Sequence, residues 1–219
     1  MKLLDFEPGE LRLKLDKYIA ADQRYAKVFE QTKIAFDAAA NLTAHNWDHA
    51  YRDTLNAIVI GEAEGADMSI VLPAITMHDI GFLYGATGKT HGEVGAEKLL
   101  EFLCGADVKY SDEMIQKIAE CIRTHKGSTH GHTPESLEAR VVADADLLEK
   151  FGPFGVYQHI RTFTEFNMSI TEVFKRRDEI LGFTLQTKTG MRLADAGRQF
   201  TSNFYSELVE ANQPYEDLA

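Results

Sequence analysis

Apolar residues recur at every third or fourth position along most of the chain, which is the period of an amphipathic α-helix. Leu11 and Leu15, followed by Val28 and Phe36, show this period and predict one or two helices between residues 8 and 40. No segment alternates apolar and polar residues between turn dipeptides, so no strand is expected. The same period predicts further helices over residues 46–64, 69–81, 90–103, 111–125, 133–150, 154–167, 169–181 and 192–211.

Capping residues mark where several of these helices begin and end. Thr90 and Glu93 have the Thr-x-x-Glu form of a capping box, and Gly65 and Gly81 follow segments that they would end. The other expected N-caps are Asn46, Ser69, Ser111 and Thr133, the last followed by proline in the first helical position. The residues expected to face inward on the final helix are Leu193, Ala196, Phe200, Phe204 and Leu208. These features predict an all-α fold, a single-domain helical bundle.

Composition and charge narrow the classes of function. The 219 residues include 23 Lys and Arg against 34 Asp and Glu, so the formal net charge is −11. Such a surface repels polyanions, and long nucleic acid is not an expected partner. No segment approaches the roughly 20 apolar residues of a membrane-spanning helix, and the N-terminus does not have the pattern of an export signal. Cys104 and Cys121 form no Cys-x-x-Cys pair, which fits a reducing compartment, so we expect a cytoplasmic protein without membrane association.

Side chains that bind metals lie at the ends or on the buried faces of several expected helices. Three or more buried histidines would each need a polar partner, and a buried carboxylate needs a cation, so one shared metal ion satisfies all of them. Imidazole and carboxylate ligands together suit Mn²⁺, Fe²⁺, Co²⁺, Ni²⁺ or Zn²⁺ better than Mg²⁺. The candidates are His49, His78, Asp79, His91, His125 and one of the pair Asp144 and Asp146.

The order of these residues resembles the HD-domain superfamily of metal-dependent phosphohydrolases, whose pattern is a His, then a His-Asp pair, then a distant Asp. His49, His78-Asp79 and the Asp144-Ala145-Asp146 segment match that pattern. The surrounding residues are similar to a small bacterial single-domain branch of the superfamily. The resemblance implies one HD-type domain over residues 1–219, with the metal-site core at about 46–150 and extra N- and C-terminal helices at 8–40 and 154–211.

The resemblance also implies the role of each candidate. His49, His78, Asp79 and Asp146 would hold one metal, and His91 and His125 would hold a second, with Asp79 bridging the two. If only one metal binds, His91 and His125 would instead contact phosphate or act as a general acid, so Asp79, His91 and His125 are the candidate catalytic residues.

The choice between the two aspartates stays open from the sequence. A large apolar residue, Leu148, follows two positions after Asp146, as it does after the superfamily's ligand. Helical phase favours Asp144, because Val141 and Leu148 flank it. We assign the ligand to Asp146 and expect Asp144 to orient a ligand histidine or a bound water.

The expected reaction is hydrolysis of a phosphoester or phosphoanhydride of a small substrate, a nucleotide, by metal-activated water. Arg52 and Lys126 would neutralise phosphate charge. Two other interpretations are a di-iron oxygenase of the same superfamily and a non-catalytic binding module stabilised by metal. Phe200 and Phe204 of the last helix would suit a homodimer as well as the core.

Overall fold

A computed structural model of the chain describes residues 7, 9–127 and 133–218. These residues form α-helices and short 3₁₀ helices, with no strand among them, so the all-α prediction is confirmed. The α-helices are α1 Glu10–Ala21, α2 Gln23–Ala38, α3 Trp47–Glu64, α4 Met68–Thr76, α5 His91–Gly105, α6 Asp112–Thr124, α7 Leu137–Leu148, α8 Gly152–Glu165, α9 Ile170–Gly182 and α10 Lys188–Asn212. The 3₁₀ helices are η1 Ile80–Tyr84 and η3 Gln213–Leu218.

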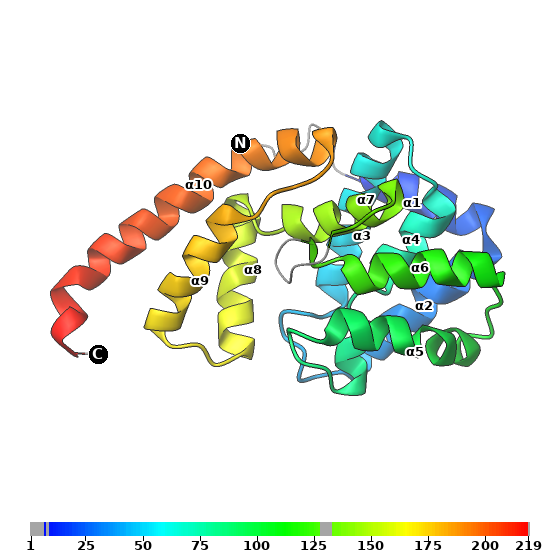
Figure 1. Cartoon of the computed structure of the whole chain (residues 1–219), viewed down its shortest axis with the longest axis horizontal. Helices are drawn as coiled ribbons and strands as arrows, with labels where there is room; N and C mark the ends of the chain where they lie inside the picture. The colour runs from blue at the N-terminus through cyan, green and yellow to red at the C-terminus, as the bar shows by residue number, and fades with distance from the viewer. Residues whose placement is uncertain (1–6, 8, 128–132, 219) are drawn as a thin grey trace.

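Helices α1 to α7 form a bundle, and α8 to α10 extend from one side of it (Figure 1). Within the bundle, α4 packs against α3, α6 and α7, and α5 packs against α6 and η1. The core between them contains fully buried side chains such as Met77, Ile80, Ile122 and Leu147. Outside the bundle, α10 packs against both α8 and α9. The C-terminus follows the end of α10 that lies away from the bundle (Figure 1). No described helix is long and apolar enough to cross a membrane.

The turn after α4 differs from the sequence prediction and shapes the site. The helix begins after Asp67, whose carboxylate accepts hydrogen bonds from both the backbone and the hydroxyl of Ser69, so Ser69 is not the N-cap. It ends at Thr76, before the expected stop at Gly81. The intervening turn carries the His-Asp pair. At Gly81 a Cβ atom would lie 2.1 Å from the carbonyl oxygen of His91, so glycine allows η1 to approach α5 closely.

Two other helix starts also differ from the prediction. Thr90 precedes α5, but its side chain accepts a hydrogen bond from the backbone of Thr87 and the expected capping box does not form. Helix α7 begins after Ser136, whose hydroxyl accepts from the backbone of Ala139, three residues later than the predicted cap at Thr133. Asn46 and Ser111 cap α3 and α6 as predicted.

The inward face of α10 includes Leu193, as predicted, but otherwise differs from the predicted one. Ala194, Gly197 and Thr201 are buried, whereas Ala196 and Phe200 are exposed. The reason is a close helix contact: a Cβ atom at Gly197 would lie 2.9 Å from the backbone nitrogen of Gly152. Small residues therefore face α8, and the large aromatic ring of Phe200 remains at the surface.

Candidate metal centre

Six side chains from separate parts of the bundle converge beside the turn between α4 and η1. One stands in the first turn of α3, two follow α4, one begins α5, one ends α6 and one lies in α7. All six are buried. They are His49, His78, Asp79, His91, His125 and Asp146, the complete predicted set.

Hydrogen bonds to backbone carbonyls fix the orientation of two of the histidines. Nδ1 of His78 lies 2.7 Å from the carbonyl oxygen of Ile75, and Nδ1 of His125 lies 2.6 Å from that of Ile122. A carbonyl oxygen only accepts, so Nδ1 donates its proton in both rings. In the neutral ring that binds a metal, each Nε2 then has a lone pair directed into the cluster.

Hydrogen bonds at Nδ1 also orient His91 and His49. Nδ1 of His91 lies 3.3 Å from the carbonyl oxygen of Thr87. Nδ1 of His49 is hydrogen-bonded to the carboxylate of Glu149. A carboxylate on the outer nitrogen of a ligand histidine fixes its tautomer and orientation, which is the usual arrangement around protein-bound metals.

Asp79 lies between two pairs of these imidazoles. Its Oδ2 atom is 3.4 Å from Nε2 of both His49 and His78. Its Oδ1 atom is 3.2 Å from Nε2 of His91 and 3.6 Å from Nε2 of His125. One carboxylate oxygen therefore faces each pair, so Asp79 could be a ligand shared by two metal ions.

The donor atoms fit divalent metal ions. The Nε2 atoms are 3.3 Å apart in the pair of His49 and His78, and 3.0 Å apart in the pair of His91 and His125. Lone pairs at that separation repel each other unless a proton or a cation lies between them. Neither oxygen of Asp79 has a hydrogen-bond partner, although both are buried. Asp146 adds Oδ1 at 3.7 Å from Nε2 of His49.

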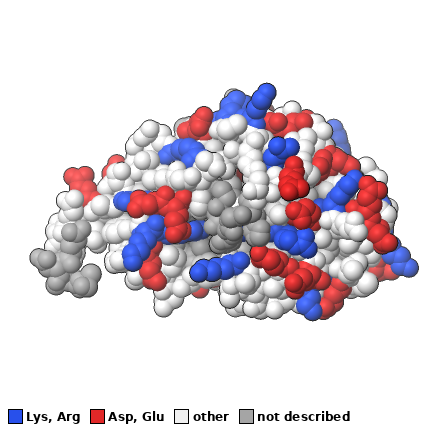
Figure 2. Space-filling model, in the orientation of Figure 1, with Lys and Arg blue, Asp and Glu red and all other residues white. Residues whose placement is uncertain are grey.

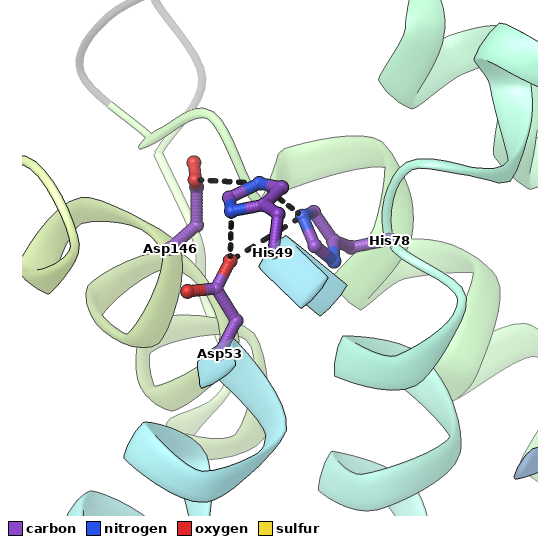
Figure 3. A group of neighbouring side chains, drawn as sticks. All are labelled: His49, Asp53, His78 and Asp146. Carbon is purple, nitrogen blue, oxygen red and sulfur yellow. Dashed lines mark hydrogen bonds and ion pairs between the residues drawn. The ribbon is translucent and has the colours of Figure 1, made fainter. Parts of the chain in front are cut away.

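Asp53 is a further member of this group that sequence reasoning missed. Its Oδ2 atom lies 3.3 Å from Nδ1 of His49 and 3.6 Å from Nε2 of His78. Figure 3 shows it on α3, pointing toward both rings, with Asp146 approaching from α7. Both Asp53 oxygens are buried without a hydrogen-bond partner. Its position four residues after His49, on the same helix face, was the signal that could have found it.

Burial and charge divide the histidines into two kinds. Burial opposes protonation of His49, but Asp53 and Glu149 outweigh it and raise the pKa of this imidazole well above its usual value. Asp79 similarly outweighs burial and raises the pKa of His78. For His125, burial and the nearby His78 lower the pKa to about 3. Burial and Lys126 also hold the pKa of His91 well below its usual value.

Arg52 does not extend freely toward a substrate. Its Nε atom donates to Glu149, the same carboxylate that holds His49, and its guanidinium lies 4.5 Å from the ring centre of Phe154. In this structure Arg52 supports a ligand histidine through Glu149. Lys126 matches the expectation better, because its Nζ atom lies 3.7 Å from Oδ2 of Asp146 and its partly buried side chain lines the adjoining cavity.

Asp144 has contacts that differ from those expected. Its carboxylate accepts hydrogen bonds from the backbone of Gln186 and from the backbone and hydroxyl of Thr187. Thr187 is the N-cap of α10, so Asp144 holds the start of that helix rather than a ligand histidine. Asp146, and not Asp144, lies in the histidine cluster.

A cavity of about 240 Å³ adjoins the cluster. Among the candidate ligands, His49, His91 and Asp146 lie on its wall. Phe163, Phe166, Met168 and Ile180 supply apolar surface. Its cationic residues are Lys89, Lys126, Lys150 and Arg176. The wall thus combines candidate metal ligands, positive charge and an apolar surface.

Both the sequence and the fold are similar to those of known proteins. The HD domain family model matches residues 46–150, which contain all six converging side chains. The fold is similar to a predicted HD superfamily hydrolase from an uncultured Thermotogales bacterium, with 22% identity, a TM-score of 0.58 and coverage of 85% of this chain and 91% of that one. Residues 46–150 of the chain therefore belong to the HD-domain superfamily.

Two further relatives extend the comparison. A Lactobacillus plantarum protein has a TM-score of 0.66 at 19% identity, covering 86% of this chain and 98% of that one. YpgQ of Bacillus subtilis, crystallised in complex with ADP, has a TM-score of 0.60 at 19% identity, covering 86% of this chain and 95% of that one. In sequence, YpgQ is 30% identical to this chain over 115 residues. The matched segment covers 52% of this chain and 55% of YpgQ, so the chain spans about half the length of that relative.

Proposed function

We propose that this HD-domain protein is a metal-dependent phosphohydrolase that cleaves a phosphoester or phosphoanhydride bond of a small nucleotide. The observation that carries the proposal is Asp79, with one oxygen toward His49 and His78 and the other toward His91 and His125. Four imidazoles with proton-bearing Nδ1 atoms and converging Nε2 lone pairs suit transition metals such as Mn²⁺, Fe²⁺, Co²⁺, Ni²⁺ or Zn²⁺. One or two divalent ions would be held there.

The candidate ligands would hold a divalent ion, which would supply Lewis acidity toward a phosphoryl oxygen and toward the attacking water. His91 and His125 are suited to the ligand role, because their lowered pKa values keep both imidazoles neutral at pH 7. The same shift argues against either of them as the general acid. Glu149 and Arg52 keep His49 in its ligand tautomer.

The protein's overall charge does not attract an anionic substrate, so local groups have to bind it. Acidic and basic side chains are interspersed over the face in Figure 2. In the cavity, by contrast, Lys126, Lys150 and Arg176 lie near candidate metal ligands. These cations would neutralise a phosphate chain, and the apolar wall at Phe163 and Phe166 would contact the rest of the ligand. YpgQ's complex with ADP supports a nucleotide as this ligand.

The test is a product screen with the purified protein. Nucleoside mono-, di- and triphosphates are incubated with it in the presence of Mn²⁺, Co²⁺ or Zn²⁺, and released phosphate and pyrophosphate are quantified separately. The proposal expects metal-dependent release from at least one nucleotide, lost in His78→Ala. Oxygen consumption with bound iron and no phosphate release would instead indicate the di-iron oxygenase of the same superfamily.

A further inference from the structure

Lys150 forms an ion pair with a candidate metal ligand. Its Nζ atom lies 3.0 Å from Oδ1 of Asp146, four residues earlier, and 3.5 Å from the carbonyl oxygen of the same residue. The Lys150 side chain is only 15% exposed and lines the cavity. It therefore contacts a candidate metal ligand and also lines the cavity in which a substrate would bind.

The oxygen that Lys150 binds also faces His49. Oδ1 of Asp146 lies 3.7 Å from Nε2 of His49. A divalent cation bound by Asp146 and His49 would take up the negative charge that now neutralises Lys150. It would also repel the lysine ammonium across a distance of a few ångströms in a buried, weakly screened site.

We propose that Lys150 changes partners during binding: it pairs with Asp146 in the metal-free protein and binds substrate phosphate once Asp146 ligates a metal. The proposal rests on the proposed phosphohydrolase function and names Lys150 as a positioning residue for its substrate. The lysine stem has four rotatable carbons and a point charge, so it can move from one anion to another without rearranging the helix.

The cavity wall indicates why the second partner is an anion from outside the protein. The acidic residues that line the described cavity are Asp146 and Glu149. Glu149 already binds His49 and Arg52. With Asp146 engaged by a metal, an anionic ligand in the cavity is the group that would neutralise Lys150.

A purely structural role for Lys150 makes different predictions. Lysines near the C-terminal end of a helix often bind its last carbonyls and pair with an acid one turn earlier. On α6, Lys117 also pairs with an acid one turn earlier, Glu113. The N and O atoms are 2.7 Å apart, and the side chains are 57% and 76% exposed. Lys117→Met is therefore a matched control for Lys150→Met, because it removes the same kind of pair far from the site.

The experiment measures two dissociation constants by calorimetry: Mn²⁺ without nucleotide, and ADP with the Mn²⁺-loaded protein. Lys150→Met should bind Mn²⁺ about tenfold more tightly than wild type, because a competing cation is gone. The same variant should bind ADP roughly tenfold more weakly, because a charged phosphate contact is lost. Lys150→Arg keeps the charge and should retain most of the ADP affinity, and Lys117→Met should change neither constant.

Tighter Mn²⁺ binding together with weaker ADP binding by Lys150→Met distinguishes the partner exchange from a purely structural role of Lys150. If Lys150→Met changes neither constant, Lys150 serves only the end of α7 and the proposal is overturned. If it weakens Mn²⁺ binding, Lys150 supports the metal site and the exchange does not occur. The Mn²⁺ titration needs no turnover, so absence of hydrolysis by the wild type would contradict the proposed function without deciding this result.

Discussion

His91 and His125 face each other with their Nε2 atoms 3.0 Å apart, although they belong to different helices. Each ring is held from behind by a backbone carbonyl, of Thr87 and Ile122 respectively. Both imidazoles are neutral near pH 7, because burial lowers their pKa values. This pair faces Oδ1 of Asp79 and is the candidate second half of the metal centre.

Removal of one ring of this pair should reduce the number of bound metal ions without abolishing binding. His125→Ala leaves His49, His78, Asp79 and Asp146 in place, so we expect the stoichiometry to fall from two metal ions per chain to one. Hydrolysis should fall by roughly 10²-fold or more. Equilibrium dialysis against Mn²⁺ followed by elemental analysis gives the count. Two ions retained, or both lost, would contradict a second site built from His91 and His125.

Arg52 and Glu149 should act on metal binding rather than on substrate binding. Glu149→Gln weakens the acceptor that orients His49, and changes of this kind typically cost about 10–100-fold in metal affinity or activity. Arg52→Ala should lower metal affinity in the same direction, because Glu149 loses its guanidinium partner. Metal titration and steady-state kinetics together give the answer. If Arg52 contacts substrate instead, the Michaelis constant should rise while metal affinity stays at the wild-type value.

Arg12→Ala is the control for the Arg52 variant. It breaks an exposed pair with Asp16, in which N and O are 2.8 Å apart, on a helix that contributes none of the candidate ligands. We expect it to leave metal affinity and kinetics unchanged, since exposed pairs of this kind contribute little.

Asp53 should make the metal-free protein less stable as pH rises. Burial raises the pKa of this carboxyl to about 8, against about 3.9 in an unfolded chain. Between these values the folded state holds a proton that the unfolded state releases, so stability falls with rising pH and the full penalty is present above pH 8. Asp53→Asn removes this contribution. Its melting temperature in chelator should therefore rise relative to wild type from about pH 4 to pH 8.

The same variant should bind metal more weakly, because a nearby cation would favour ionisation of Asp53, and asparagine cannot supply that negative charge beside His49 and His78. Calorimetric titration with Mn²⁺ at pH 7.5 measures that change. If the difference in melting temperature between wild type and Asp53→Asn stays constant from about pH 4 to pH 8, Asp53 is not a buried carboxyl of raised pKa.

Gly81 should be intolerant of any side chain. A Cβ atom there would lie 2.1 Å from the backbone oxygen of His91, so Gly81→Ala must separate η1 from α5. We expect a loss of roughly 2–3 kcal/mol in unfolding free energy, together with weaker metal binding at His91. Gly105→Ala is the control, because nothing lies within 4 Å of a Cβ at this last residue of α5. It should be neutral or slightly stabilising in a denaturant titration.

Part of the candidate metal centre was predictable because several of its residues end an apolar helical stripe or stand in a helix's first turn. His78 and His125 follow buried runs at helical spacing, and this periodicity places them on inward faces. The remaining ligands were found from their order along the chain. Local pattern was sufficient for these residues because each is positioned by its own helix.

The residues that sequence reasoning missed depend on contacts between distant segments. Glu149 supports His49 from 100 positions away, and Arg176 reaches the cavity from α9. No periodic pattern specifies such pairs. The face of α10 was mistaken for a related reason: Gly197 and Ala194 are buried by close helix contact, while hydrophobicity alone favours Phe200.

In the proposed function, His78 and Asp79 bind a metal ion that is required for hydrolysis. The most direct measurement is elemental analysis of protein purified without added metal, for wild type and for the His78→Ala/Asp79→Ala double variant, with nucleotide hydrolysis assayed on the same samples. We predict one or two transition-metal equivalents per chain in the wild type, and loss of both the metal and the hydrolysis in the double variant. Equal metal content in both proteins, or hydrolysis that survives the double substitution, would contradict it.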